Sequence, residues 1–259
     1  MGGLLIFYNW MSRKGKVYKA IERLLSPATD QFVCISKAEY QSAISNGIDK
    51  GDRLRVIENG INVKAVEDAV PMVRQQLGIP EDAFVIGMVG RLTPQKAPDT
   101  FVKAAKLINE LIPNTYYIIV GNGEEENEVK QYAEENNIRL FVTGWTDMPY
   151  SYLKVFDIAV LLSRWEGFGL AIAEYMAAEK NFVATRVDAI PTIVDDGVDG
   201  KLVNVDSPKE VAEAVYYYYT HPVEAEVMRK KAKEKVIRQY DISRVVMQHK
   251  QLFKELVNG

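Results

Sequence analysis

From residue 85 onward, short apolar runs alternate with amphipathic stretches of helical length, such as 101–111 and 126–135. The apolar runs lack alternating polarity, which indicates strands that are buried on both faces of a parallel sheet. The alternation predicts an α/β fold with a Rossmann-like parallel sheet and helices on both faces, which binds ligands at the carboxyl ends of its strands. The predicted strands are 85–89, 116–120, 140–143, 158–162, 182–185 and 201–203.

The C-terminal segment is predicted to be helical. Ser207-Pro208-Lys209-Glu210 has the residues of a capping box, so a helix should begin there and end before His221-Pro222. A charged helix is expected over 224–238 and a last helix over 243–256, which could cap the α/β domain.

The first 60 residues form a separate block. Strands are predicted over 32–35 and 53–57, and between them Ser36 begins a second capping box, whose helix ends at Asn46-Gly47. With the amphipathic segment before residue 25, these elements make a helix–strand–helix–strand fragment, which is too small for a sheet of its own. We therefore expect the block to pack on the larger domain or on a missing partner.

Composition excludes several functional classes. The net charge of −3 gives no basic field for nucleic acid. A single cysteine, Cys34, excludes an internal disulfide and a cysteine-rich zinc site, which favours the reducing cytoplasm. A basic amphipathic segment over residues 10–25 suggests a peripheral contact with the inner face of the membrane, whereas the alternative is a helix that packs on its own protein.

The most informative stretch follows the predicted strand 158–162 and contains Glu166, Gly167 and Gly169. The glycines allow a tight turn, so the amides of a helix that begins near Leu170 can face an anion. On a continuous helix, Glu166 and Glu174 would lie roughly 12 Å apart along the axis, too far to act together on one bond. This spacing suits the two ends of a long phosphorylated ligand.

Six motifs occur in a consistent order along most of the chain. Together they resemble those of the retaining glycosyltransferases with two Rossmann-like domains (GT-B), family 4, also called glycosyl transferases group 1, and mainly their C-terminal donor-binding domain. The motifs are V-I-E-N-G-I-N at 56–62, G-R-L-T-P-Q-K-A at 90–97, G-N-G at 121–123, V-T-G at 142–144, E-x7-E at 166–174 and D-G-V-D-G-K-L-V at 196–203.

The resemblance implies a role for each matching residue. Arg91 and Lys96 would hold the diphosphate of a nucleotide-sugar and stabilise the leaving group without a metal or another cofactor. Glu166 would contact the transferred sugar, and Glu174 the ribose. Together with Arg91 and Lys96, Glu166 is a predicted catalytic residue. The donor-binding residues that the motifs add are Gly90, Gly121, Gly167, Phe168, Gly169 and Leu170.

Two departures from the family pattern bear on function. The family's G-G-x-x-E loop reads Asp188-Ala189-Ile190-Pro191-Thr192 here, which adds one carboxylate and removes another. Only the last part of an N-terminal acceptor domain is present, as in a shortened protein, one half of a two-chain enzyme with an acceptor-domain partner, or a degraded gene. The predicted division is a remnant of that domain with its linker at 1–62, a nucleotide-sugar-binding domain at 63–240, and a C-terminal helix at 241–259.

The resemblance predicts a cytoplasmic transferase that moves a hexosyl group from a nucleotide-sugar to a glycan or lipid-linked acceptor with retention, in polysaccharide or glycolipid synthesis. One alternative is a non-catalytic module that binds nucleotide-sugar or docks a partner. Another is a nucleotide-sugar epimerase on the same fold, although no additional acid or base is evident for it. A dinucleotide-dependent dehydrogenase is disfavoured, because Glu124, Glu125 and Glu126 would repel a pyrophosphate at 121–123.

Overall fold

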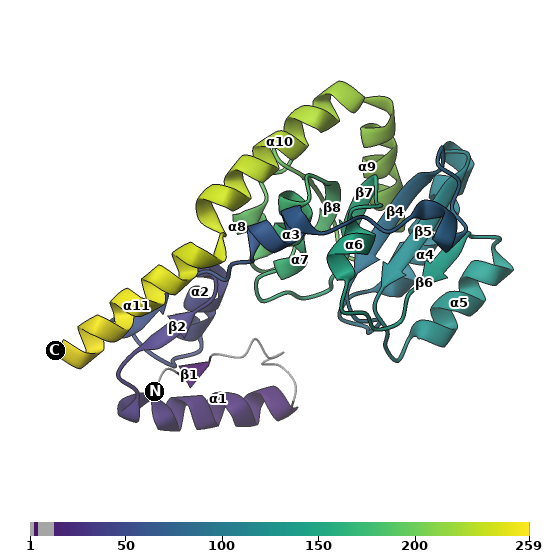
Figure 1. Ribbon diagram of the computed structural model, residues 1–259. Coiled ribbons are helices and arrows are strands. Elements are labelled where there is room, and N and C mark those ends of the chain that lie inside the picture. Colours follow the sequence, from purple (N-terminus) through teal and green to yellow (C-terminus); the bar gives the residue numbers. More distant parts are fainter. Residues whose placement is uncertain (1–2, 5–12, 259) are drawn as a thin grey trace.

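The computed structural model describes residues 3–4 and 13–258 and contains two parallel sheets (Figure 1). The larger sheet has the strand order β6-β5-β4-β7-β8-β9. It confirms the predicted Rossmann-like fold, and each predicted strand end lies within one residue of the observed end. The strands are β4 (Phe84–Val89), β5 (Thr115–Val120), β6 (Leu140–Val142), β7 (Ile158–Leu161), β8 (Asn181–Thr185) and β9 (Lys201–Val203).

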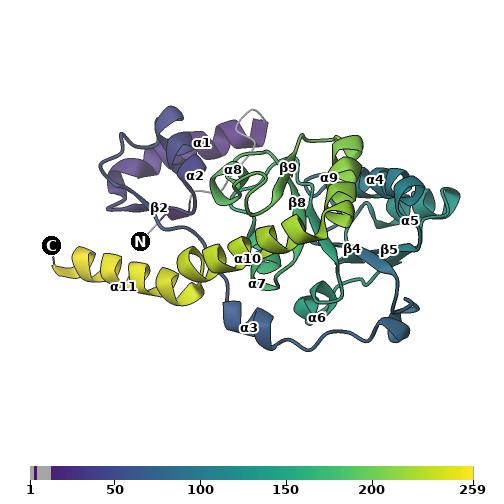
Figure 2. The ribbon, with the colours of Figure 1, turned by 90° about the horizontal axis from the view of Figure 1, so that it is seen from above.

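Helices cover both faces of the larger sheet (Figure 2). In β7, Ile158 and Val160 belong to the core on one face, and Ala159 and Leu161 to the core on the other. Because both faces are buried, the strand sequence shows no polar alternation. One face is covered by α4 (Pro98–Leu111), α5 (Glu126–Glu135) and α9 (Pro208–Thr220), and the other by α3 (Val63–Asp68), α6 (Pro149–Leu153), α7 (Leu170–Ala177) and α10 (Pro222–Gln239).

Short helical segments complete the larger unit, namely η2 (Arg74–Leu77) and α8 (Ile190–Ile193). The expected helix over 126–135 is observed with those bounds, and the one over 101–111 begins three residues earlier, at Pro98. Within residues 13–258, no helix is both long enough and apolar enough to cross a membrane.

The N-terminal block forms a three-stranded parallel sheet of its own, so the prediction that it is too small for one was wrong. Its strands lie in the order β1-β2-β3, and the short β1 pairs with β2. The buried cluster on this sheet includes Phe32, Cys34 and Leu54. The elements are β1 (Gly3–Leu4), α1 (Arg13–Leu25), η1 (Ser26–Ala28), β2 (Phe32–Cys34), α2 (Lys37–Ser45) and β3 (Leu54–Val56).

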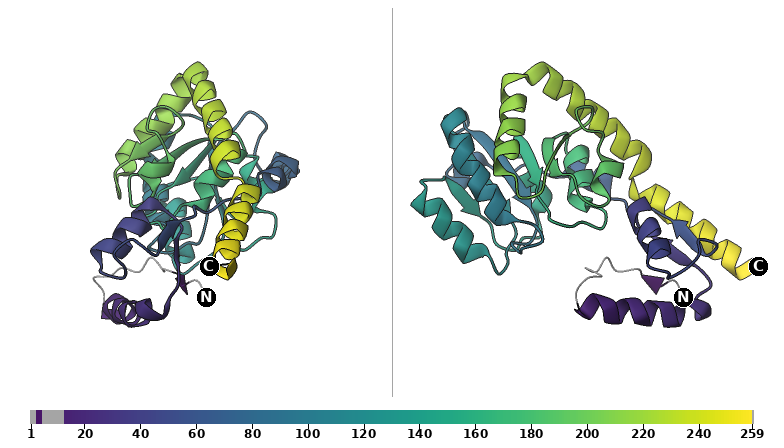
Figure 3. Two further views of the ribbon diagram at one scale, coloured as in Figure 1. Left: turned by 90° about the vertical axis from the view of Figure 1, so that its left-hand side faces the viewer. Right: turned by 180° about the vertical axis from the view of Figure 1, so that it is seen from behind.

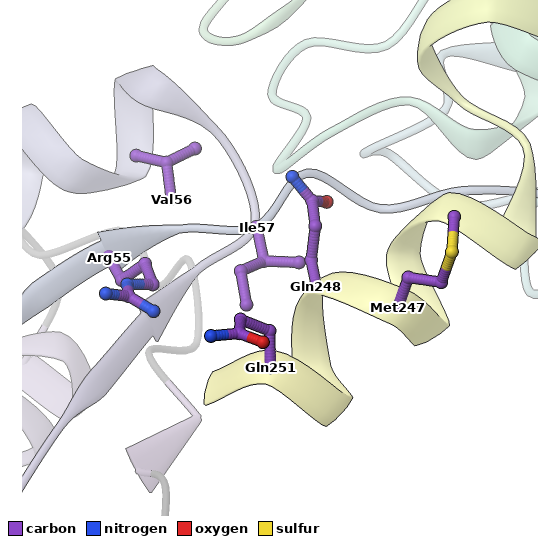
Figure 4. Close-up of a pocket in the computed structure, with 6 residues that line it drawn as sticks. All are labelled: Arg55, Val56, Ile57, Met247, Gln248 and Gln251. Atoms are coloured by element: carbon purple, nitrogen blue, oxygen red, sulfur yellow. The ribbon is translucent and has the colours of Figure 1, made fainter. Parts of the chain in front are cut away.

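The last helix, α11 (Ile242–Asn258), runs away from the larger sheet and beside the N-terminal strands (Figure 3). Val245 and Leu252 of this helix form a buried cluster with Ile57, so α11 packs on the N-terminal block instead of capping the α/β domain. Figure 4 shows Ile57 pointing toward α11, beside Gln248 and a cavity of about 420 Å³. This cavity lies away from the loops that the motifs predict to bind the donor.

The two capping boxes behave differently. The Ser36 hydroxyl accepts a hydrogen bond from the Glu39 amide (3.1 Å), so the prediction for α2 is confirmed, although the Glu39 carboxylate accepts from the Ile35 amide and not from that of Ser36. In the described chain, the Ser207 side chain does not cap α9. The Glu210 carboxylate instead accepts both hydrogen bonds from Asn204, so that capping prediction was wrong.

Candidate functional site

The predicted donor loops meet where the strand order of the larger sheet reverses. From the central pair β4 and β7, the chain continues outward through β5 and β6 on one side and through β8 and β9 on the other. The loops after β4 (90–97) and β7 (162–169) therefore lie side by side at the carboxyl edge. This switch point is where open α/β sheets bind their ligands.

Glycines let the loops after β4 and β5 approach each other closely. A Cβ atom on Gly121 would lie 2.1 Å from the Gly90 carbonyl oxygen, and one on Gly123 would lie 2.2 Å from that of Leu92. The Leu92 amide donates to the Asn122 carbonyl (2.9 Å). Within the protein, Gly90 and Gly121 thus serve backbone packing, and their contact with a donor stays a prediction.

Lys96 and Glu166 form an ion pair across the two central loops. The Lys96 ammonium lies 2.5 Å from Glu166 Oε2, and the Ser163 hydroxyl donates to the same oxygen at 3.0 Å. The Lys96 and Glu166 side chains are only 16% and 12% exposed. Two of the three predicted catalytic side chains therefore lie in direct contact. Glu166 lies in the loop before α7, so the spacing expected for a continuous helix does not apply.

Arg91, the third predicted catalytic residue, is exposed at the start of the same β4 loop. Its guanidinium lies 3.4 Å from Gln95 Oε1, a long hydrogen bond. Gln95 in turn donates to the Trp165 carbonyl (3.1 Å), which links the β4 loop to the β7 loop. The cationic side of the site therefore consists of one paired lysine and one arginine that is accessible to a ligand.

Arg164 joins these loops, and the sequence analysis missed it. Its guanidinium donates to the carboxylates of Asp99 and Asp206 at 2.8 Å each, and to the Pro94 carbonyl at 2.7 Å. Its amide donates to the Gln95 carbonyl (2.8 Å). The only sequence signal is a basic residue three positions after the end of the buried strand β7, and its partners lie far away in the chain. Arg164 thereby fixes the positions of Lys96 and Glu166 relative to each other.

The loop after β8, which differs from the family's G-G-x-x-E pattern, also contacts the site. Asp188 has a positive φ of 43°, and its carboxylate accepts a hydrogen bond from the Glu166 amide at 2.8 Å. The Thr192 hydroxyl donates a hydrogen bond to the Ala189 carbonyl (2.7 Å) within the same loop. The added carboxylate therefore lies within hydrogen-bonding distance of the Glu166 backbone.

Helix α7 begins after Gly169, which has a φ of 93°. In the described part of the chain, no group accepts a hydrogen bond from the amides of Gly167, Phe168 or Gly169. The Phe168 ring is buried against Tyr240 (5.5 Å between centroids), whereas Leu170 is exposed. The side chain of Phe168 thus anchors the turn, which leaves the neighbouring amides available to an anion.

Glu174 lies one helical turn further along α7. The Tyr150 hydroxyl donates to its carboxylate (3.1 Å). Burial raises the pKa of Glu174, while the Tyr150 hydrogen bond and the charge of Lys96 act in the opposite direction. Burial and the Glu174 charge raise the pKa of Tyr150 to about 12, so its hydroxyl stays protonated at neutral pH. Glu174 is therefore a hydrogen-bond acceptor held in place at the edge of the site.

Metal-ligating residues do not gather in the described part of the chain: it contains no group of three or more His, Cys, Asp or Glu side chains that could hold a metal ion. The two histidines lie in the helical tail. His221 stacks on Tyr217 with 4.4 Å between ring centroids, and His249 bonds to the Val245 carbonyl.

The larger sheet and the loops at its switch point have the architecture of one half of the GT-B fold. The family model described as "Glycosyl transferases group 1" matches residues 71–235. The chain belongs to this glycosyltransferase family, as its motifs predicted.

Curated relatives and solved structures agree with this assignment. The chain is 30% identical over 249 residues to the UDP-Gal:alpha-D-GlcNAc-diphosphoundecaprenol alpha-1,3-galactosyltransferase of Escherichia coli, covering 93% of this chain and 64% of that protein. It is 27% identical to the putative glycosyltransferase EpsD of Bacillus subtilis, covering 87% and 59%. The chain thus spans about three fifths of these relatives.

Among solved structures, HepE from Anabaena in complex with UDP is 20% identical and superimposes with a TM-score of 0.85, covering 96% of this chain and 70% of that one. The C-terminal domain of a glycosyl transferase group 1 protein (LpcC) from Francisella tularensis has a TM-score of 0.63 at 23% identity, covering 71% and 100%. These similarities support the fold.

Proposed function

We propose that the chain is the donor-binding half of a retaining, metal-independent glycosyltransferase that transfers a hexosyl group from a nucleotide-sugar. The observation that supports this most is the Lys96–Glu166 ion pair, with Arg91 exposed on the same β4 loop, beside amides before α7 that have no acceptor among the described residues. Two cations and a helix N-terminus suit a diphosphate, and the flanking carboxylates suit sugar hydroxyls.

In this proposal, the donor diphosphate lies over the turn at Gly167–Gly169. Arg91 and Lys96 stabilise the negative charge that grows on the leaving phosphate, so no metal is required. Glu166 accepts hydrogen bonds from the transferred sugar, and Glu174 accepts them from the ribose. The bond between the anomeric carbon and the leaving phosphate breaks while the acceptor hydroxyl oxygen bonds to that carbon on the same face and gives its proton to the leaving phosphate, which results in retention.

The names of the relatives suggest the substrate class. The Escherichia coli relative is named for UDP-galactose and a lipid-linked diphosphate acceptor, and HepE was solved with UDP. We therefore propose a UDP-hexose donor and a glycan or lipid-linked acceptor, in polysaccharide or glycolipid synthesis in the cytoplasm. The acceptor would bind between this chain and an acceptor domain, of which the predicted remnant at 1–62 supplies part.

Calorimetry with UDP-, GDP- and ADP-sugars, beside transfer assays, tests the proposal. We expect one nucleotide class to bind, and Glu174→Ala to weaken that binding about 10-fold or more through the lost ribose contact. Arg91→Ala with Lys96→Ala should abolish donor binding or transfer. Glu110→Ala, an exposed change on α4, is the control and should bind normally. Absence of binding to every nucleotide-sugar would refute the proposal, whereas binding without turnover would favour the non-catalytic module.

Helix α1 supports a second contact, with the membrane that carries a lipid-linked acceptor. Val17, Ile21 and Leu24 lie at helical spacing and are 59%, 45% and 79% exposed, so this apolar stripe is largely uncovered in the described part of the chain. The opposite side of the helix bonds to Asn46 through Lys19 and Arg23 (2.7 and 2.8 Å). Residues 10–12 of the predicted contact segment lie outside the described residues.

Sedimentation with vesicles that contain anionic lipid tests this contact. The wild-type chain should sediment with these vesicles, and Leu24→Glu should remove most of the binding, because a charge then replaces the most exposed residue of the stripe. Val70→Glu is the matched control, since Val70 is 77% exposed but lies between α3 and η2. A wild-type chain that stays in the supernatant would contradict the membrane contact.

A further inference from the structure

Asp188 occupies a position where the backbone favours glycine. Its φ of 43° lies in the left-handed region, which is unfavourable for a residue with a Cβ atom. The family loop that this segment resembles has glycine here. Strain that persists beside a ligand site needs a compensating interaction, and it often serves the site.

The compensating interaction is the hydrogen bond to the Glu166 amide. An N–H···carboxylate bond of 2.8 Å is charge-assisted, which makes it stronger than a bond between neutral groups. The other end of Glu166 is also fixed, because its carboxylate receives the Lys96 ammonium and the Ser163 hydroxyl. Glu166 is therefore fixed at its backbone by the β8 loop and at its side chain by the β4 and β7 loops.

The position of Glu166 also determines the position of the turn before α7, because Gly169 of that turn packs closely on its neighbours. A Cβ atom on Gly169 would lie 3.5 Å from Glu166 Cγ and 2.6 Å from Ile190 Cδ1. The turn is therefore packed between the Glu166 side chain and α8, which begins two residues after Asp188. A shift of the Glu166 backbone would move the turn whose amides face the predicted diphosphate.

We infer that Asp188 is a positioning residue, which uses its carboxylate to hold Glu166 in the orientation that contacts the transferred sugar. This inference rests on the proposed function for its catalytic consequence. Its structural part, the capture of the Glu166 amide, does not depend on any ligand. In the same proposal Glu174 holds the ribose, so a shift of the Glu166 backbone should lower kcat more than it lowers the affinity for the nucleoside diphosphate.

Two substitutions separate positioning from general stability. Asp188→Asn keeps an acceptor oxygen of the same shape, and Asp188→Gly removes the acceptor while it relieves the left-handed backbone. The matched control is Glu179→Gly. Glu179 is another exposed acidic residue with a positive φ (52°), and it lies after α7, away from the loops of the site.

The first measurement is amide hydrogen exchange at Glu166 in the ligand-free chain, read by NMR. We expect protection in the wild type and in Asp188→Asn, and exchange faster by at least about 10-fold in Asp188→Gly. The Glu179→Gly control should leave this amide unchanged. Equal protection in the wild type and in Asp188→Gly would overturn the inference, whether or not the chain binds nucleotide-sugars.

The second measurement compares kcat with nucleotide affinity, with an acceptor domain supplied. Asp188→Gly should lower kcat about 10- to 100-fold, because a displaced catalytic group forfeits orientation, while the affinity for the free nucleoside diphosphate stays within about 3-fold. Asp188→Asn should recover most of the rate. A wild-type kcat in Asp188→Gly, or equal losses of nucleotide affinity and kcat, would overturn the inference. A wild-type chain that binds no nucleotide-sugar would instead refute the proposed function.

Discussion

The Lys96–Glu166 pair gives the most quantitative prediction, tested by Lys96→Met and Glu166→Gln, singly and together. Both side chains are largely buried, at 16% and 12% exposure, and their charged atoms are 2.5 Å apart. With an effective dielectric constant of about 20 and charge centres about 3.5 Å apart, the attraction is about 5 kcal/mol before desolvation is subtracted. Lys96→Met leaves the Glu166 carboxylate with the Ser163 hydroxyl as its remaining partner among the described residues, and it should destabilise the fold by about 3 kcal/mol.

The double variant should be destabilised by about 2 kcal/mol less than the sum of the two single variants, because each single change already removes the same interaction. Urea unfolding of the four proteins, followed by circular dichroism and by the fluorescence of the three tryptophans, measures this coupling. Repeating the cycle in high salt is the control, since a buried pair is screened much less than a surface pair. Free energies that add within about 0.5 kcal/mol would refute the description of a coupled pair.

Three further predictions concern other parts of the fold. Burial raises the pKa of Glu39 to about 7 from its ordinary 4.5. The folded state therefore favours protonated Glu39, and the contribution of this residue to folding stability is complete below pH 4.5 and is lost as pH rises through 7. Across this pH window, the free energy of unfolding of the wild type should fall by up to about 3 kcal/mol relative to that of Glu39→Gln. Curves of unfolding free energy against pH that stay parallel for the two proteins would contradict this prediction. Arg164→Ala should lower the rate of sugar transfer about 10-fold or more, because the loops after β4 and β7 lose the side chain that joins them. Arg164→Lys should recover little of that rate, and equal transfer rates in the wild type and both variants would contradict this role of Arg164. Gly87→Ala should destabilise the fold by about 1–3 kcal/mol, because the new methyl would lie 2.1 Å from the Phe156 ring, and an unchanged unfolding midpoint would contradict that packing.

The larger sheet was predictable because its physical signal is local. A strand that is buried on both faces, such as β7, needs apolar residues at every position, and that need appears directly in a short stretch of sequence. The N-terminal sheet was missed because β1 comprises only Gly3–Leu4, and each of these residues pairs with a β2 residue 29 positions further along. So short a strand has no periodicity of its own, and it is defined by pairing alone.

The capping boxes show the same distinction. Ser36 and Ser207 both precede a helix with glutamate three residues later, yet only Ser36 caps its helix. Glu210 has competing donors in the Asn204 amide and side chain, which the turn after β9 brings within 2.8 Å. Sequence spacing supplies the residues of a cap, whereas the fold decides which hydrogen bond forms.

For the site, the motifs predicted which loops meet but not how their charges pair. The resemblance assigned Lys96 to a diphosphate and Glu166 to a sugar, and in the structure these two side chains form an ion pair with each other. Arg164 and Asp188, which fix the loops, contact residues between 22 and 70 positions away, so no local pattern could reveal them. Their roles depend on the tertiary structure.

This pairing has a consequence for the order of events in the proposed reaction. A diphosphate that approaches the turn before α7 meets Lys96 already neutralised by Glu166, whereas Arg91 has only a 3.4 Å contact with Gln95 among the described residues. Arg91 can therefore engage the donor without breaking a strong interaction, while Lys96 must be shared with or released from Glu166. Because a released Glu166 carboxylate becomes a better acceptor for sugar hydroxyls, the same rearrangement couples phosphate binding to sugar binding.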